Sequence, residues 1–155
     1  MKTILAPVDF STVTDRVCEA AATLARAVSG RVILLHSVPP PIITGEFPLT
    51  ENVARIVALQ EKAAARNLAR LQKKLQRGFV VAETLQLHGA PVNPILEQAN
   101  AFGADYIVIG SHGHTALYNL LVGSTTHGVL SKSPCPVLIV PPGLKKVVKS
   151  RRARR

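Results

Sequence analysis

The sequence is poor in cysteine, in aromatic side chains and in acids. It has two cysteines, Cys18 and Cys135, no tryptophan, and 4% aromatic residues among 155. Two cysteines cannot build a disulfide framework, which excludes the disulfide-rich secreted class, and we expect both to be free structural thiols. No secretory signal is visible and no apolar run approaches the roughly 18 residues of a membrane span, so we expect a cytoplasmic location.

Acids are outnumbered, and the excess of positive charge lies at the C-terminal end. The chain has 19 lysine and arginine residues and nine acids, a formal net charge of +10. Seven of these charges belong to residues 145–155 (KKVVKSRRARR), which leaves +3 for the rest. We therefore expect a basic, disordered tail over residues 142–155. Two interpretations stay open: a solvated end, or a weak and nonspecific contact with nucleic acid or an anionic membrane surface.

What the chain has in abundance is apolar sequence, with 47% hydrophobic and 18% charged residues and a mean hydropathy of +0.23. We interpret residues 1–141 as one domain with a sizeable core. Apolar runs predict strands over 3–8, 32–36, 79–87, 105–109 and 137–140, and helical spacing predicts helices over 12–29, 50–76, 91–102 and 124–132. Strands alternating with helices predict an α/β fold, a mainly parallel five-stranded sheet in a three-layer sandwich.

Local signals predict where the helices end and which faces they bury. Thr12 and Asp15 match a capping box for the first helix, and Gly30 is placed as its C-terminal stop. Val53, Ile56 and Val57 begin the expected buried face of the long helix, which continues through Ala64, Leu68, Leu71 and Leu75. We interpret the lysine and arginine residues around 66–77 as its solvated side. Gly103 is expected to stop the helix over 91–102.

The segment after the fourth predicted strand is rich in glycine and ends in residues suited to helix capping. Glycines recur at Gly110, Gly113 and Gly123, followed by Ser124, Thr125 and Thr126. A strand, a glycine loop and a helix start together form an anion cradle, because free N–H groups and the helix dipole favour a phosphate. The alternative is a purely structural turn. Asp9 follows the first strand, and if the two strands are neighbours it lies beside this cradle.

These residues together resemble a known family. The spacing Gly110-x2-Gly113-x9-Gly123-Ser124, with Pro7-Val8-Asp9-Phe10-Ser11 near the start and 134–140 (PCPVLIV) at the end, is similar to the universal stress protein family over residues 1–141. The resemblance implies a five-stranded parallel sheet in the order 3-2-1-4-5, an adenine nucleotide alpha hydrolase-like fold. It also implies binding of ATP or AMP, with Mg²⁺, and a homodimer formed through the edge strand Val137–Val140.

The same resemblance assigns roles to single residues. Asp9 would lie near the ribose or a phosphate-bound metal, Val8 and Val38 would line the adenine pocket through backbone contacts, and the glycines would wrap the phosphates. Ser124 and Thr125 would donate hydroxyl and N–H groups. The candidate nucleotide-binding set is Pro7, Val8, Asp9, Val38, Gly110, His112, Gly113, His114, Gly123, Ser124, Thr125 and Thr126.

Other features of the loop argue against efficient catalysis. No lysine or arginine lies between Gly110 and Gly128, and Asp9 is the one carboxylate expected near the loop. His114 replaces the family's usual cation and carries charge only below roughly pH 6.5, so ATP affinity should rise as the pH falls from 8 to 6. His112, His114 and His127 could be metal ligands, but polar lining is the more economical interpretation.

Three functional hypotheses follow. The first is a nucleotide-dependent regulatory protein of the universal stress type, which holds ATP without accelerating its hydrolysis. The second is a slow Mg²⁺- or Mn²⁺-dependent ATPase that uses Asp9. The third is a protein that associates with nucleic acid through its basic tail.

Overall fold

Strands and helices alternate along the chain, as the sequence predicts. The computed structural model describes residues 1–40, 51–111 and 122–143. In chain order the elements are β1 (Thr3–Pro7), α1 (Thr14–Ala27), β2 (Arg31–Val38), α2 (Glu51–Arg77), β3 (Val81–His88), α3 (Val92–Ala101), β4 (Tyr106–Gly110), α4 (Ser124–Lys132) and β5 (Val137–Val140). His112, Gly113, His114 and the expected basic tail from residue 144 onward lie outside the described residues.

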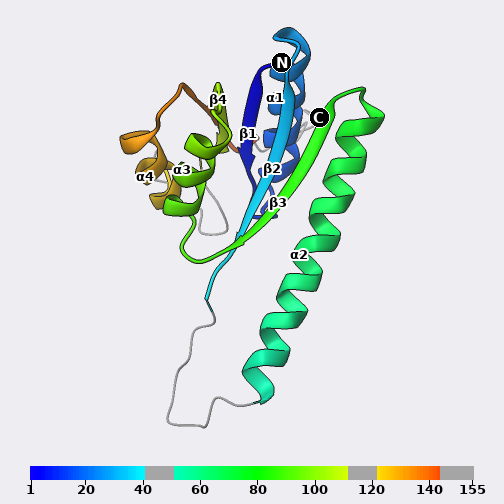
Figure 1. Cartoon of the computed structure of the whole chain (residues 1–155), viewed down its shortest axis with the longest axis vertical. Helices are drawn as coiled ribbons and strands as arrows, with labels where there is room; N and C mark the ends of the chain where they lie inside the picture. Colours follow the sequence, from blue (N-terminus) through cyan, green and yellow to red (C-terminus); the bar gives the residue numbers. More distant parts are fainter. Residues whose placement is uncertain (41–50, 112–121, 144–155) are drawn as a thin grey trace, which may run out of the picture.

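The five described strands form one parallel sheet in the order β3-β2-β1-β4-β5, which confirms the expected topology. Figure 1 labels the first four strands of this order. β1 lies at the centre, where Leu5 is paired with Ile33 of β2 and Ile107 of β4. Consecutive residues of β1 face opposite sides, and Ile4 and Leu5 are both fully buried. The strand therefore has no polar alternation, as expected of a sheet covered on both faces.

Helices cover the two faces of the sheet and complete the three layers. On one face, Val17 of α1 and Leu68 and Leu71 of α2 pack on the sheet. On the other, Ile95 of α3 and Val129 of α4 belong to a second buried cluster. Among the described helices, none is both long enough and apolar enough to cross a membrane.

The predicted N-terminal cap of α1 is wrong, whereas Gly30 follows the end of the helix as expected, and its N–H donates to the Ala25 carbonyl at 2.8 Å. The helix begins at Thr14 after Val13, which makes no side-chain cap, so the Thr12–Asp15 capping box does not form. The preceding turn is closed instead by the Thr14 N–H, which donates to the Ser11 carbonyl at 3.1 Å. After α1, Ser29 rather than Gly30 takes the left-handed conformation, with φ 51°.

Helix α2 is longer than the sheet it covers, which overturns part of its predicted buried face. Its C-terminal half is anchored as expected, with Leu68, Leu71 and Leu75 all buried. Its N-terminal half extends past the ends of the strands (Figure 1), and Ile56 is 50% exposed. The third strand also starts later than predicted: Phe79 has a positive φ of 59° and is 97% exposed, and β3 begins at Val81.

Candidate functional site

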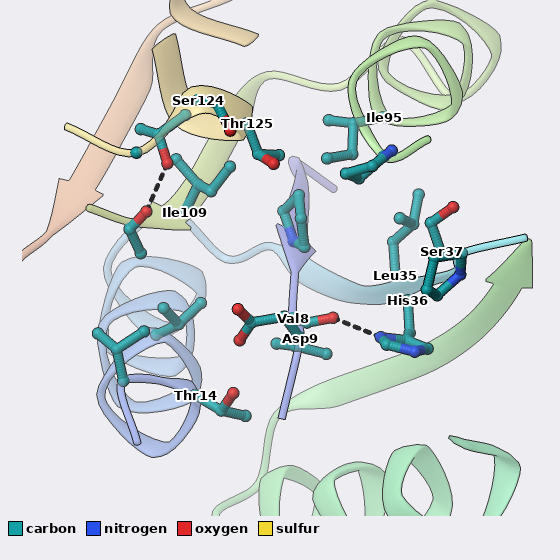
Figure 2. A pocket seen from close by; sticks show the side chains of 18 residues that line it. Val8, Asp9, Thr14, Leu35, His36, Ser37, Ile95, Ile109, Ser124 and Thr125 are labelled. Carbon is teal, nitrogen blue, oxygen red and sulfur yellow. Dashed lines mark hydrogen bonds between the residues drawn. The ribbon is translucent and has the colours of Figure 1, made fainter. Parts of the chain in front are cut away.

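The sheet order creates a crevice at the carboxyl end of its central strands. The chain leaves β1 toward α1 on one face and leaves β4 toward α4 on the other, and β1 is paired with β4. Ligands bind at such a switch point in open α/β sheets. A cavity of about 380 Å³ lies there (Figure 2), within the range of small-molecule sites. It is lined by Pro7, Val8, Asp9, Val13, Thr14, Val17, Leu35, His36, Ser37, Pro39, Pro91, Ile95, Ile109, Gly110, Gly123, Ser124, Thr125 and Thr126.

Eight of the twelve candidate residues meet in this cavity. They come from the end of β1 and from both sides of the glycine segment: Pro7, Val8, Asp9, Gly110, Gly123, Ser124, Thr125 and Thr126. Val38 is buried but does not line the cavity, whereas Ser37 and Pro39 on either side of it do. The other three candidates fall outside the described residues. The sequence thus located the cavity, and the ligand-binding role of each residue stays a prediction.

Side-chain and backbone hydrogen bonds hold the start of α4 against the end of β4. The Thr126 hydroxyl donates to the Gly110 carbonyl at 2.6 Å, and the Gly123 N–H donates to the Ser111 carbonyl at 2.7 Å. The Ser111 N–H in turn donates to the Val140 carbonyl at 2.8 Å, which ties β5 to the same point. The helix start is therefore fixed in place before any ligand arrives.

The predicted capping function of Ser124, Thr125 and Thr126 is wrong. The residue at the N-cap is Gly123, in an extended conformation with φ −70° and ψ 160°, and it has no side chain to bond the first turn. The three hydroxyl residues are instead the first turn of α4. Backbone N–H groups at these positions have no intrahelical acceptor and attract anions through the helix dipole. The first turn of α4 lines the cavity, so it offers an anion site there.

Asp9 supplies the acid of the site. Its Oδ1 accepts a hydrogen bond from the Ser11 N–H at 3.0 Å, which fixes the carboxylate at the turn after β1. Among the described lining residues Asp9 is the single carboxylate. Figure 2 shows it on the same cavity as Ser124 and Thr125.

His36 is a site residue that sequence reasoning missed. Its Nδ1 lies 2.8 Å from the Val8 carbonyl oxygen (Figure 2). Because a carbonyl only accepts, Nδ1 carries the proton and Nε2 of the neutral ring is an acceptor. The ring packs against Phe10, with centroids 4.3 Å apart, and Phe10 has a left-handed φ of 60°. The sequence did carry one signal for this residue: His36 is a polar side chain near the carboxyl end of β2, in an otherwise apolar run.

The backbone of the expected adenine pocket is already hydrogen-bonded within the protein. The Val8 N–H donates to the Leu35 carbonyl at 2.8 Å, and the Val8 carbonyl accepts from His36. The Val38 carbonyl accepts from the Gly89 N–H at 3.0 Å. These three hydrogen bonds fix the backbone on this side of the cavity.

Neither cysteine belongs to a reactive site. Both are free thiols, as predicted, and burial raises the pKa of Cys18 to about 11. The pKa of Cys135 is also raised, chiefly by burial. A raised pKa keeps most of a thiol protonated and so lowers its reactivity. In the described part of the chain no three histidine, cysteine or acidic side chains come together as a metal site.

The fold agrees with what comparison with known proteins finds. "Universal stress protein in QAH/OAS sulfhydrylase 3'region" from Thermus aquaticus is 34% identical over 140 residues, 90% of this chain and 98% of the relative. The solved structure of the protein MJ0577 is 28% identical with a TM-score of 0.83, over 93% of this chain and 98% of that one. A universal stress protein from Archaeoglobus fulgidus, solved in complex with dAMP, is 24% identical with a TM-score of 0.65, over 90% and 97% of the two chains.

The family model for "Universal stress protein family" matches residues 1–141, the stretch that carries the strands, the helices and the cavity of the described structure. With this match the resemblance noted in the sequence becomes an assignment: the chain belongs to the universal stress protein family.

Proposed function

We propose that the chain binds ATP or AMP in the cavity at the ends of β1 and β4 and acts as a nucleotide-dependent regulatory protein. The observation that carries the proposal is the first turn of α4, which has no side-chain cap and opens onto the same cavity as Asp9. A helix start without a side-chain cap is a ready anion site. The dAMP complex of the Archaeoglobus fulgidus protein supports an adenine nucleotide as the ligand.

The lining divides into an apolar part and a polar part, which suits the two ends of a nucleotide. Leu35, Ile95 and Ile109 provide apolar wall for a base. The N–H groups of Ser124 and Thr125 and their hydroxyls suit the phosphates. Asp9 lines the same cavity directly after β1, and its carboxylate can accept hydrogen bonds from the ribose hydroxyls.

A divalent cation fits this donor set when phosphate is present. Mg²⁺ is usually held by one or two carboxylates together with substrate phosphates, and Asp9 supplies one carboxylate. Bound there, the ion would neutralise phosphate charge.

The alternative function, slow hydrolysis of ATP, depends on the same carboxylate. A measurable ATP turnover that is lost in Asp9→Ala would support this alternative. Negligible turnover with Mg²⁺ or Mn²⁺ would favour a regulatory protein.

Ser124 provides a sharp test of the phosphate position. Ser124→Asp places a negative charge at the start of α4, where it stabilises the helix dipole but repels a phosphate. We expect at least about a tenfold loss of ATP affinity by calorimetry, about 1.4 kcal/mol, with unchanged or raised thermal stability. Ser124→Asn is the matched neutral control and should bind within about threefold of the natural protein. The absence of heat with every adenine nucleotide, together with no nucleotide in the purified protein, would refute the proposal.

A further inference from the structure

Helix α2 carries a stripe of positive charge that the nucleotide site does not use. Arg55, Lys62, Arg66, Arg70, Lys73 and Arg77, called the α2 stripe below, are all exposed. They are separated by seven, four, four, three and four residues, and at 3.6 residues per turn this spacing keeps them on one side of the helix. In Figure 1, α2 forms an outer edge of the molecule, so the stripe is accessible along its length.

The stripe has no internal neutralisation in the described structure. None of the four ion pairs found among the described residues includes one of its six cations. Glu61 pairs with His88 at 2.7 Å, and Lys74, beside the stripe, pairs with Asp15 at 2.9 Å. Like charges four residues apart destabilise a helix, and the stripe repeats that spacing several times. A local conflict of this kind is typical of a functional surface, where a partner supplies the missing charge.

The length of the stripe and its single sign of charge favour an extended polyanion. Arg55 and Arg77 are 22 residues apart, about 33 Å along a helix. One turn of duplex DNA is about 34 Å long and carries phosphates at regular intervals on each strand. No aromatic residue and no asparagine belongs to the stripe, so it is suited to phosphates rather than to base edges.

An anionic membrane fits the same helix less well. A membrane-surface helix inserts its apolar face into the lipid. In the C-terminal half of α2 that face is occupied, because Ala64, Leu68, Leu71 and Leu75 are buried there. Four of the six stripe cations, Arg66, Arg70, Lys73 and Arg77, belong to this half. We propose that the α2 stripe binds the phosphate backbone of double-helical DNA without sequence specificity, separately from the nucleotide site and from the C-terminal tail.

The test compares two variants of the full chain that lose the same charge. One removes three stripe cations (Lys62→Gln, Arg66→Gln and Arg70→Gln), and the other removes three tail cations (Arg151→Gln, Arg152→Gln and Arg154→Gln). Binding to a labelled duplex of about 20 base pairs, two helical turns, is measured by fluorescence anisotropy across a salt series. Circular dichroism checks that helix content is unchanged, which glutamine favours.

We expect log K of the natural protein to fall linearly with log salt, and the slope to decrease by about three in the stripe variant. The tail variant should keep the slope of the natural protein. Equal losses in the two variants would mean a net-charge effect and would overturn the proposal, as would loss in the tail variant alone or no DNA binding at low salt. Binding to phosphatidylserine vesicles but not to DNA, with the same dependence on the stripe, would also overturn it.

Discussion

The Thr126 hydroxyl is the side-chain link between the end of β4 and the start of α4. The Thr126 side chain is 3% exposed and donates to the Gly110 carbonyl at 2.6 Å. Thr126→Val keeps the shape but removes the donor, leaving a carbonyl unsatisfied beside the cavity. We expect a loss of about 1–3 kcal/mol in the free energy of unfolding, measured by urea denaturation. Thr126→Ser retains the hydroxyl and is the matched control; a valine variant as stable as the serine variant would contradict the assignment.

The two thiols should differ in reactivity because they differ in burial. Cys18 is 1% exposed and its pKa is raised to about 11, while Cys135 is partly exposed. Alkylation requires both access and the thiolate. Iodoacetamide at pH 8, followed by mass spectrometry, should modify Cys135 well before Cys18. Equal rates at the two positions would show that α1 opens more readily than its packing indicates.

At the scale of single residues, the spacing of residues along the sequence predicted which of them meet at the site. It did not predict roles that depend on tertiary contacts. Asp9 follows β1 and Gly110 ends β4, and the two were placed together correctly because these strands are neighbours in one parallel sheet. His36 was missed because its role depends on a hydrogen bond to Val8 and a ring contact with Phe10. Both partners lie on a different strand and turn, so no local sequence pattern reveals these contacts. Thr126 was expected to cap the helix, but its hydroxyl instead donates to the Gly110 carbonyl at the end of β4.

The junction of α1 and β2 depends on the small size of Gly30, although its conformation does not require glycine. A Cβ at Gly30 would lie 2.7 Å from Ile4 Cδ1 and 2.8 Å from the Lys2 carbonyl oxygen. Gly30→Ala should therefore separate β1 from the start of β2 and cost about 1–3 kcal/mol of unfolding free energy. Gly143→Ala, where the nearest atom is the end of the Arg16 side chain at 3.4 Å, is the control. We expect it to change stability by less than about 0.5 kcal/mol.

The starts of β1 and β4 are joined by Asp105. Its carboxylate accepts from Lys2 Nζ and from the Thr3 N–H, both at 2.8 Å, and these bonds lower its pKa below the usual 3.8. The unfolded chain takes up this proton first as the pH falls, so the stabilisation is complete above about pH 4 and is lost as the pH drops through the lowered pKa.

Asp105→Asn should therefore be less stable than the natural protein at neutral pH, with the difference shrinking below pH 4. Urea midpoints measured from pH 7 down to pH 2.5 check this. A difference that stays constant over that range would show that Asp105 acts through packing and not through its charge.

At the scale of elements, apolar runs predicted the strands and helical spacing predicted the helices that the structure describes, and the errors lie at the ends of the elements. The first helix starts at Thr14 because the preceding turn closes on Ser11, a contact that capping rules do not include. Ile56 was expected to be buried because helical spacing shows which face is apolar but not how far the sheet extends. Element ends depend on neighbours that are distant in sequence.

At the scale of the whole molecule, alternation of strands and helices was enough for the layered α/β fold, whereas the strand order came from the family resemblance. The order matters because it alone puts β1 beside β4 and creates the cavity. It also leaves two edge strands that differ in chemistry. β3 carries Glu83, Thr84 and Gln86, whereas β5 reads Val-Leu-Ile-Val.

An apolar edge strand invites pairing with a second copy, whereas charged and polar residues discourage it. The homodimer predicted from the sequence should therefore form through β5. Leu138 of β5 is 45% exposed, and Leu138→Lys should convert the dimer to a monomer in size-exclusion chromatography with light scattering. Leu130→Lys on α4, where the leucine is 49% exposed, is the matched control and should remain dimeric. If the natural protein were a monomer at micromolar concentration, or if both variants dissociated alike, the β5 interface would be wrong.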